Sequence, residues 1–325
     1  MHKTAVAYTV GRLMQAMGLV LLIPLGIGLW DGWSSDGGSV LLLPEVSGFV
    51  LAVVLSLLFG SALALAFRSG RGYLGVSEGY AIVTFGWISL AFVAAIPLCA
   101  YFLATHSVEH GGFALAFTDA YFEVMSGFTT TGASILSDIE AVPRSLLFLR
   151  ALTHWLGGMG IITLAIAILP AMSVSGYQMF RGEVPGPSKD KLMPRLKQTA
   201  SILWGVYLLF TAAETVLLMV GGMNLFDAVC HAFATMATGG FSNSNQSIAG
   251  YNSAFIEWVV IFFMYLAGVN FVLHFRALRG DVRSMVTNKE FVFYNGVIIV
   301  AIVVITGVLS IHGLDSEKAT SQHFR

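Results

Sequence analysis

Residues 117–134 read FTDAYFEVMSGFTTTGAS, and residues 225–242 read LFDAVCHAFATMATGGFS. The two stretches align at a shift of 108 residues, which places Gly132 on Gly240 and Ser134 on Ser242. Each begins as a half-apolar, helix-like segment that is too short to span a membrane and too apolar for a water-exposed loop. Each ends in threonine and glycine, which do not continue a helix easily. The pattern predicts an internal repeat of two re-entrant half-helices, each followed by extended backbone.

The ends of both stretches have the composition of an ion-selective loop. Backbone carbonyls of extended chain can replace the water around a dehydrated cation. Glycine at positive φ allows successive carbonyls to point the same way, and threonine adds a hydroxyl oxygen. The half-helix would direct its partly negative C-terminus toward the bilayer centre, which favours a cation there. One Thr-Gly stretch alone is more often a tight turn, but two copies in register predict a pair of filter loops.

The composition indicates that the chain is a membrane protein and that the repeat lies within the lipid bilayer. Of the 325 residues, 56% are hydrophobic and only 11% are charged, whereas soluble domains carry about 25% charged residues. The net charge of -1 leaves no polybasic patch, so no nucleic-acid partner is expected. The two cysteines have neither disulfide nor metal-site spacing. These features exclude a soluble enzyme and a nucleic-acid-binding protein.

Seven apolar spans are predicted, and the basic residues orient them. The spans are residues 10–30, 47–67, 80–104, 150–175, 199–221, 255–275 and 291–311. With the N-terminus in the cytoplasm, 13 of the 17 basic residues lie inside and four lie outside, namely Arg144, Arg150, Lys318 and Arg325. Loops rich in lysine and arginine stay in the cytoplasm. A multi-pass protein with a cytoplasmic N-terminus is therefore predicted.

The spans and half-helices divide the chain into units. Residues 1–79 form a predicted N-terminal two-helix hairpin with a cytoplasmic loop. Residues 80–198 form a first pore repeat with its cytoplasmic linker, and residues 199–290 form a second pore repeat with its linker. Residues 291–325 supply the first helix of an incomplete third repeat. The chain is therefore expected to be a fragment that is truncated after the start of the third repeat.

Further motifs carry a resemblance to a known family. The sequence TTTGAS at 129–134 is followed by HWLGGMGII at 154–162 and EVPGP at 183–187, and MATGGFS at 236–242 is followed by NFVLHF at 270–275. Over essentially its whole length the chain resembles the Trk/Ktr/HKT superfamily of cation transporters, and within it the bacterial TrkH-type potassium uptake membrane subunit. The resemblance implies an all-α polytopic membrane protein of repeated units, each with a first helix, a re-entrant pore helix, a filter loop and a second helix, arranged as in potassium channels.

The resemblance also implies potassium uptake across the bacterial inner membrane through a central filter. Four units would each give one filter strand, and the third and fourth strands are absent from this sequence. By position, the residues that would bind the ion are Thr130, Thr131, Gly132, Thr238, Gly239 and Gly240. The glycine of the first unit suits K⁺ over a sodium-preferring variant. A homodimer and a cytosolic nucleotide-binding regulatory ring are further implied, with K⁺ as the transported ion and no organic cofactor in this chain.

Other functions compete with this interpretation. A water or small-solute channel would use Asn-Pro-Ala turns, which both loops lack. A membrane enzyme would need a nucleophile–base pair or a cluster of metal ligands at the midplane, and the sequence offers neither, so no enzyme activity is expected. A non-conducting or structural membrane relative, or a channel or transporter for Na⁺, stays open. Coupling to H⁺ or Na⁺ is not decided by the sequence.

Four acidic residues near the predicted loops or inside a span have roles to be tested. Asp119 and Asp227 are expected to cap the N-termini of the half-helices. Glu123 would either hydrogen-bond backbone near the filter or face the vestibule. Glu214 is the one acid well inside a predicted span, where proton coupling and pairing with a neighbouring helix are both open.

Overall fold

The computed structural model describes residues 2–36, 40–70, 76–105, 112–160 and 189–311, and these residues form helices and connecting turns without a strand. Five helices are long and apolar enough to cross a membrane: Lys3–Ser34, Pro44–Ala66, Ser77–Thr105, Ala200–Val220 and Lys289–Ser310. A bent helix pair would make a sixth crossing if it is counted as one span. The all-α, multi-pass architecture is thus confirmed.

The N-terminal part is a helical hairpin. It consists of α1 (Lys3–Val20), α2 (Leu22–Asp36), the short 3-10 helix η1 (Val40–Leu42), α3 (Pro44–Ala66) and η2 (Arg68–Gly70). Helix α1 packs along α3, where a Cβ on Gly11 would come within 2.8 Å of the Gly60 carbonyl oxygen. The predicted span 10–30 contains a break at Leu21, because Pro24 has no N–H to donate to the carbonyl one turn before it.

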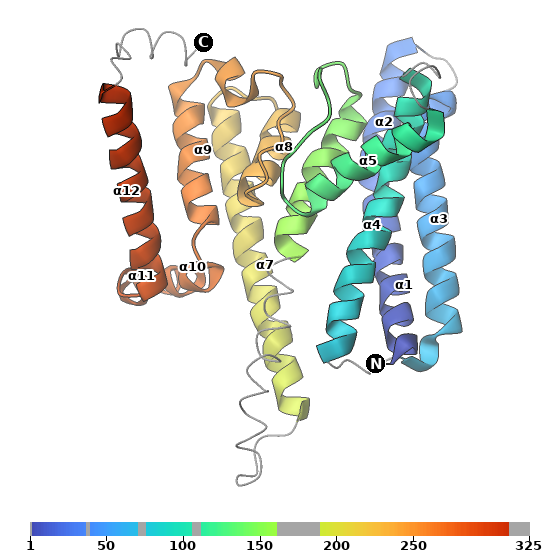
Figure 1. The fold of residues 1–325 in the computed structure, drawn as a ribbon, viewed down its shortest axis with the longest axis horizontal. Helices are drawn as coiled ribbons and strands as arrows, with labels where there is room; N and C mark the ends of the chain where they lie inside the picture. The colour runs from blue at the N-terminus through green and yellow to red at the C-terminus, as the bar shows by residue number, and fades with distance from the viewer. Residues whose placement is uncertain (1, 37–39, 71–75, 106–111, 161–188, 312–325) are drawn as a thin grey trace.

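The first repeat has the predicted order of elements. Helix α4 (Val76–Thr105) packs against α1, α3 and α5 (Gly112–Phe128). With 17 residues, α5 is about 25 Å long and does not reach across a bilayer core of about 30 Å. The chain then turns back through a loop into a helix over residues 144–160 (Figure 1). Residues 161–175 of the predicted span 150–175 lie outside the described part of the chain.

The second repeat has the same order. Helix α7 (Lys189–Val220) packs against α8 (Leu225–Met236) and α9 (Ala254–Ala267), with the 3-10 helix η4 (Ser247–Tyr251) before α9. Helix α8 has 12 residues, about 18 Å, so it also ends inside a bilayer. Both half-helices are therefore re-entrant elements between longer helices. The boundaries of the predicted units stay a prediction.

The predicted span 255–275 is wrong as a single helix. Helix α9 ends at Ala267, α10 (Phe271–Leu278) begins after three residues, and the two axes are bent by 103°. The Asn270 side chain caps the new helix by accepting a hydrogen bond from the Val272 N–H at 3.0 Å. Helices α10 and α11 (Val282–Val286) lie across the end of the molecule where the N-terminus also lies (Figure 1). This common end agrees with the predicted sidedness of the loops.

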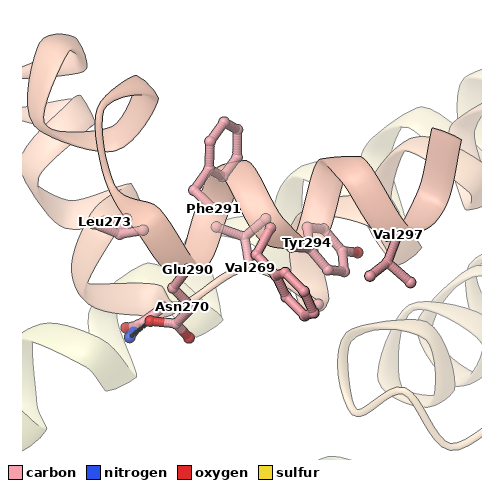
Figure 2. Close-up of a pocket in the computed structure, with 9 residues that line it drawn as sticks. Val269, Asn270, Leu273, Glu290, Phe291, Tyr294 and Val297 are labelled. Carbon is pink, nitrogen blue, oxygen red and sulfur yellow. Dashed lines mark hydrogen bonds between the residues drawn. The ribbon is translucent and has the colours of Figure 1, made fainter. Parts of the chain in front are cut away.

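A cavity of about 300 Å³ lies between this break and α12 (Lys289–Ile311). Figure 2 shows its lining, which is mostly apolar and includes Val269, Phe291 and Val297. At its polar edge the Asn270 amide donates a hydrogen bond to the Glu290 carboxylate at 3.2 Å. The break in the helix is thus tied to the start of α12 by the same residue that caps α10.

Candidate filter loops

Two loops with the same backbone geometry follow α5 and α8. Gly132 and Gly240 have φ values of 73° and 87°, as their proposed role in the loops requires. Thr130 and Thr238 have φ values of 53° and 55°, which the sequence did not predict. A left-handed backbone is strained for a β-branched residue. Each loop therefore has positive φ at a threonine and again two residues later at a glycine.

The same hydrogen bonds end both half-helices. The Thr130 N–H donates to the Gly127 carbonyl at 3.0 Å, and the Thr131 N–H donates to the Ser126 carbonyl at 2.9 Å. In the second unit, Thr238 and Gly239 make the equivalent bonds to Thr235 and Ala234, both at 2.9 Å. This is the Schellman arrangement, in which a left-handed residue closes the last helical turn. The repeat seen in the sequence is thus a repeat in hydrogen bonding.

The two loops are in direct contact. A Cβ on Gly132 would collide with the carbonyl oxygen of Gly239, so only glycine fits there. Gly239 itself packs against the imidazole of His154, and a Cβ would collide with that ring. The structure therefore brings all six predicted site residues into two adjacent loops. Their role in binding an ion stays a prediction.

A buried ion pair contacts the residues that follow both loops, and it was not predicted from the sequence. Arg150 Nε is 2.8 Å from Glu123 Oε1, and both side chains are buried. The Arg150 guanidinium also donates to the Ser134 hydroxyl at 3.2 Å and to the Ser242 carbonyl at 3.3 Å. Arg150 is one of the four basic residues predicted on the outside, and its side chain is buried. Arg150 instead joins the first loop to the second.

Glu123 organises the first loop. Its carboxylate accepts hydrogen bonds from the Ser134 hydroxyl at 2.8 Å and from the Ile135 N–H at 3.0 Å. Of the two roles considered for Glu123, bonding to backbone near the loop is the observed one.

Phe241 anchors the second loop by packing against Arg150 and His154. Its ring stacks on the His154 imidazole with centroids 4.0 Å apart, and the Arg150 guanidinium lies 4.2 Å from its centroid. Arg150 and His154 are one turn apart on the helix over residues 144–160, so one face of that helix holds the ring. A signal was available in the sequence, since both residues stand in or just before the HWLGGMG motif.

The glycines of this motif allow the same helix to approach both loops. A Cβ on Gly157 would collide with the Phe128 carbonyl oxygen, at the end of the first half-helix. A Cβ on Gly158 would come within 3.0 Å of Ala237, at the end of the second. These glycines therefore let the helix pack closely against the ends of both half-helices.

Outside the loops, hydrogen bonds join the two repeats again. The Glu140 carboxylate accepts from the Ser244 hydroxyl at 2.9 Å and from the Asn245 N–H at 3.1 Å. The Asn245 side chain in turn donates to Asp138 at 2.8 Å and accepts from the Ile139 N–H at 2.8 Å. The two units are therefore joined twice, once by the contacts of Arg150 and once by these hydrogen bonds of Glu140 and Asn245.

The expected N-caps are wrong. Helix α5 begins at Gly112, so Asp119 lies two turns inside it. Asn224 caps α8 by accepting from the Asp227 N–H at 2.9 Å, and Asp227 stands in the first turn. Glu214 is fully buried in α7, and its carboxylate lies close to the Thr235 side chain of α8.

Known proteins match this chain over nearly its whole length. The family described as "TrkH: Cation transport protein" matches residues 46–305. The Trk system potassium uptake protein TrkH of Escherichia coli K12 is 38% identical over 318 residues, which cover 97% of this chain and 62% of that protein. The Trk system potassium uptake protein TrkG of the same strain is 32% identical and is matched over 62% of its length. The chain thus spans about 62% of these relatives.

A solved structure agrees with the sequence matches. The crystal structure of the potassium transporter TrkH from Vibrio parahaemolyticus superimposes with a TM-score of 0.80 at 28% identity, over 97% of this chain and 61% of that one. The repeated loops, the buried pair behind them and these matches lead to one conclusion. The chain belongs to the TrkH family of cation transport proteins.

Proposed function

We propose that this chain supplies two strands of a potassium-selective filter, and that the natural protein takes up K⁺ as the pore-forming subunit of a Trk-type system. The observation that carries the proposal is the pair of matched loops, in contact through Gly132 and Gly239, each at the end of a re-entrant helix. Loops of this kind present carbonyl oxygens that replace the ion's water. The potassium specificity is supported by the names of the relatives.

The exposed face of α9 supports a ring of more than two units. At the shift of 108 residues, Trp258 and Phe262 stand where Arg150 and His154 stand in the first unit. Arg150 and His154 are 2% and 0% exposed because they face the second loop, whereas Trp258 and Phe262 are 70% and 54% exposed. The rotation that carries the first unit onto the second would place a third unit over this face. Four units around one axis, as in the family resemblance, satisfy this geometry.

The finer features of the proposal follow from family membership and charge. We place the protein in the bacterial inner membrane on the basis of its family. We place its N-terminus in the cytoplasm, because the basic residues of α10 and α11 lie at the same end as the N-terminus. A homodimer and a cytosolic nucleotide-binding ring of the TrkA type are the proposed partners. The filter binds K⁺ as cargo, and the chain needs no organic cofactor and catalyses no reaction.

The proposal is tested by potassium uptake. The natural protein, expressed in bacteria that lack their own potassium uptake systems, should restore growth at low K⁺ and take up a rubidium tracer. The Gly132→Ala variant should lose this activity, whereas Gly205→Ala should keep it, because a Cβ at Gly205 meets no atom of the described residues within 4 Å. Absence of uptake by the well-expressed wild-type protein would favour a non-conducting relative. Equal uptake of Na⁺ would favour a channel or transporter without potassium selectivity.

A further inference from the structure

The two half-helices carry different polar residues at one equivalent position. Glu123 in α5 and His231 in α8 are related by the shift of 108 residues, and so are Ser134 and Ser242. Glu123 accepts a hydrogen bond from the Ser134 hydroxyl at 2.8 Å. His231 Nε2 lies 3.1 Å from the Ser242 hydroxyl, and its side chain is buried. In both units a buried half-helix residue therefore contacts the serine two positions after the loop glycine.

The remaining contacts decide which nitrogen of His231 carries the proton. His231 Nδ1 lies 2.8 Å from the Asp227 carbonyl, which only accepts, so Nδ1 is the donor. In a neutral ring Nε2 is then the acceptor, and the Ser242 hydroxyl donates to it. The Ser242 oxygen accepts from the Ser244 N–H at 3.1 Å. The Ser134 oxygen likewise accepts from the Leu136 N–H at 3.2 Å, so both serines make the same two kinds of bond.

The surroundings explain why a neutral residue replaces the carboxylate. Glu123 is paired with Arg150, but the position equivalent to Arg150 in the second unit holds Trp258. The ring of Tyr251 lies edge-on to His231 with centroids 5.6 Å apart. Burial and the nearby Asp227 carboxylate raise the pKa of Tyr251, so its phenol carries no charge at neutral pH. A carboxylate at position 231 would thus be buried without a cation of its own among the residues that the structure describes.

We infer that His231 is a positioning residue for the second filter loop: its neutral Nδ1–H imidazole holds the Ser242 hydroxyl, and with it the backbone beyond Gly240, as Glu123 holds Ser134 in the first loop. The inference rests on the proposed function and names what keeps the second strand in register for K⁺. It also makes the two strands chemically unequal, since one is held by an ion pair and the other by a neutral hydrogen bond.

The test is the ratio of K⁺ to Na⁺ flux through the natural protein in liposomes. His231→Leu and Ser242→Ala should each lower this ratio by about three- to tenfold, as expected for one lost hydrogen bond. The double variant should be no worse than the poorer single variant, because both remove the same bond. His231→Gln should keep the wild-type ratio, because an amide can both donate to the Asp227 carbonyl and accept from Ser242. His231→Glu should lower the ratio of K⁺ to Na⁺ flux.

A buried histidine elsewhere in the chain gives the matched control. His274 is buried in α10 and contacts the Leu266 carbonyl at 2.8 Å. His274→Leu should reduce the amount of folded protein and leave the flux ratio unchanged, which is what a merely structural role of His231 would also do. A wild-type ratio in His231→Leu, or additive losses in the double variant, would overturn the inference.

A second readout separates this inference from the proposed function. Melting temperatures of the same single and double variants, measured in detergent, report the coupling of His231 to Ser242 without any ion passing. Coupling together with a wild-type flux ratio near one would overturn the potassium filter and leave the contact in place. Additive melting shifts together with a high wild-type ratio would overturn the inference alone.

Discussion

Gly132 lies against the carbonyl of Gly239, so the loop that follows α5 rests on the backbone of the loop that follows α8. By the repeat, Gly240 is the counterpart of Gly132, yet a Cβ on Gly240 meets no atom of the described residues within 4 Å. The first unit therefore presents its glycine to the loop of the second unit, whereas the glycine of the second unit faces none of the described residues.

A closed ring of units predicts that the Gly132→Ala and Gly240→Ala variants lose uptake to the same extent. Alanine at either position must adopt a positive φ, which costs about 1–2 kcal/mol. If a further unit packs beside the second loop, Gly240→Ala also meets a carbonyl and should reduce rubidium uptake as strongly as Gly132→Ala. Tracer uptake by equal amounts of membrane-inserted protein measures the effect. Near-normal uptake by Gly240→Ala alone would argue against a closed ring on that side.

The buried Glu123–Arg150 ion pair should contribute far more to the free energy of unfolding than an ion pair on the surface does. Glu123→Gln leaves the Arg150 guanidinium buried without its counter-charge, which should lower the free energy of unfolding by about 3–5 kcal/mol. Arg144 and Asp31 are 3.5 Å apart, with side chains 55% and 30% exposed, so Arg144→Ala should cost at most about 1 kcal/mol. Thermal unfolding in detergent distinguishes the two. Comparable losses for both variants would contradict the network described here.

The strained threonines should matter for selectivity more than for stability. Replacing Thr130 or Thr238 with glycine relieves a left-handed β-branched residue but adds backbone freedom to the unfolded chain. The two effects oppose each other, so the free energy of unfolding should change by no more than about 1 kcal/mol. The K⁺/Na⁺ flux ratio should fall, because the loop backbone becomes looser. Loss of stability with an intact ratio would assign the threonines a purely structural role.

The break between α9 and α10 depends on Asn270. Asn270→Ala removes the cap on the Val272 N–H and should destabilise the protein by about 1 kcal/mol. Asn270→Asp keeps a capping oxygen but places a second carboxylate beside Glu290, the partner of the Asn270 amide. Adding Glu290→Gln to Asn270→Asp should therefore recover stability. Thermal unfolding of the three variants checks this, and a double variant less stable than Asn270→Asp would speak against the contact.

Much of the fold was predictable because lipid restricts the choices. Long apolar runs predicted α3, α4, α7 and α12, and the shift between residues 117–134 and 225–242 predicted both half-helices and their loops. The positive φ of Gly132 and Gly240 was expected from the properties of glycine. These features are local, so the sequence pattern contains them.

The features that were missed depend on contacts between distant residues. The role of Arg150 was missed, because no local pattern shows that its guanidinium reaches Glu123 and the Ser242 carbonyl. The span 255–275 looked continuous, because the apolar residues on both sides of Asn270 hide a capping residue that starts a new helix. Asp227 looked like a cap, but Asn224 stood closer to the start of α8.

Selection of potassium by the two loops is tested most directly by the K⁺/Na⁺ permeability ratio of the purified natural protein in a lipid bilayer. Wild-type protein should strongly prefer K⁺, and Gly132→Ala should bring the ratio toward one while Gly205→Ala leaves it unchanged. A ratio that is the same in wild type and in Gly132→Ala would contradict the assignment of these loops as the filter.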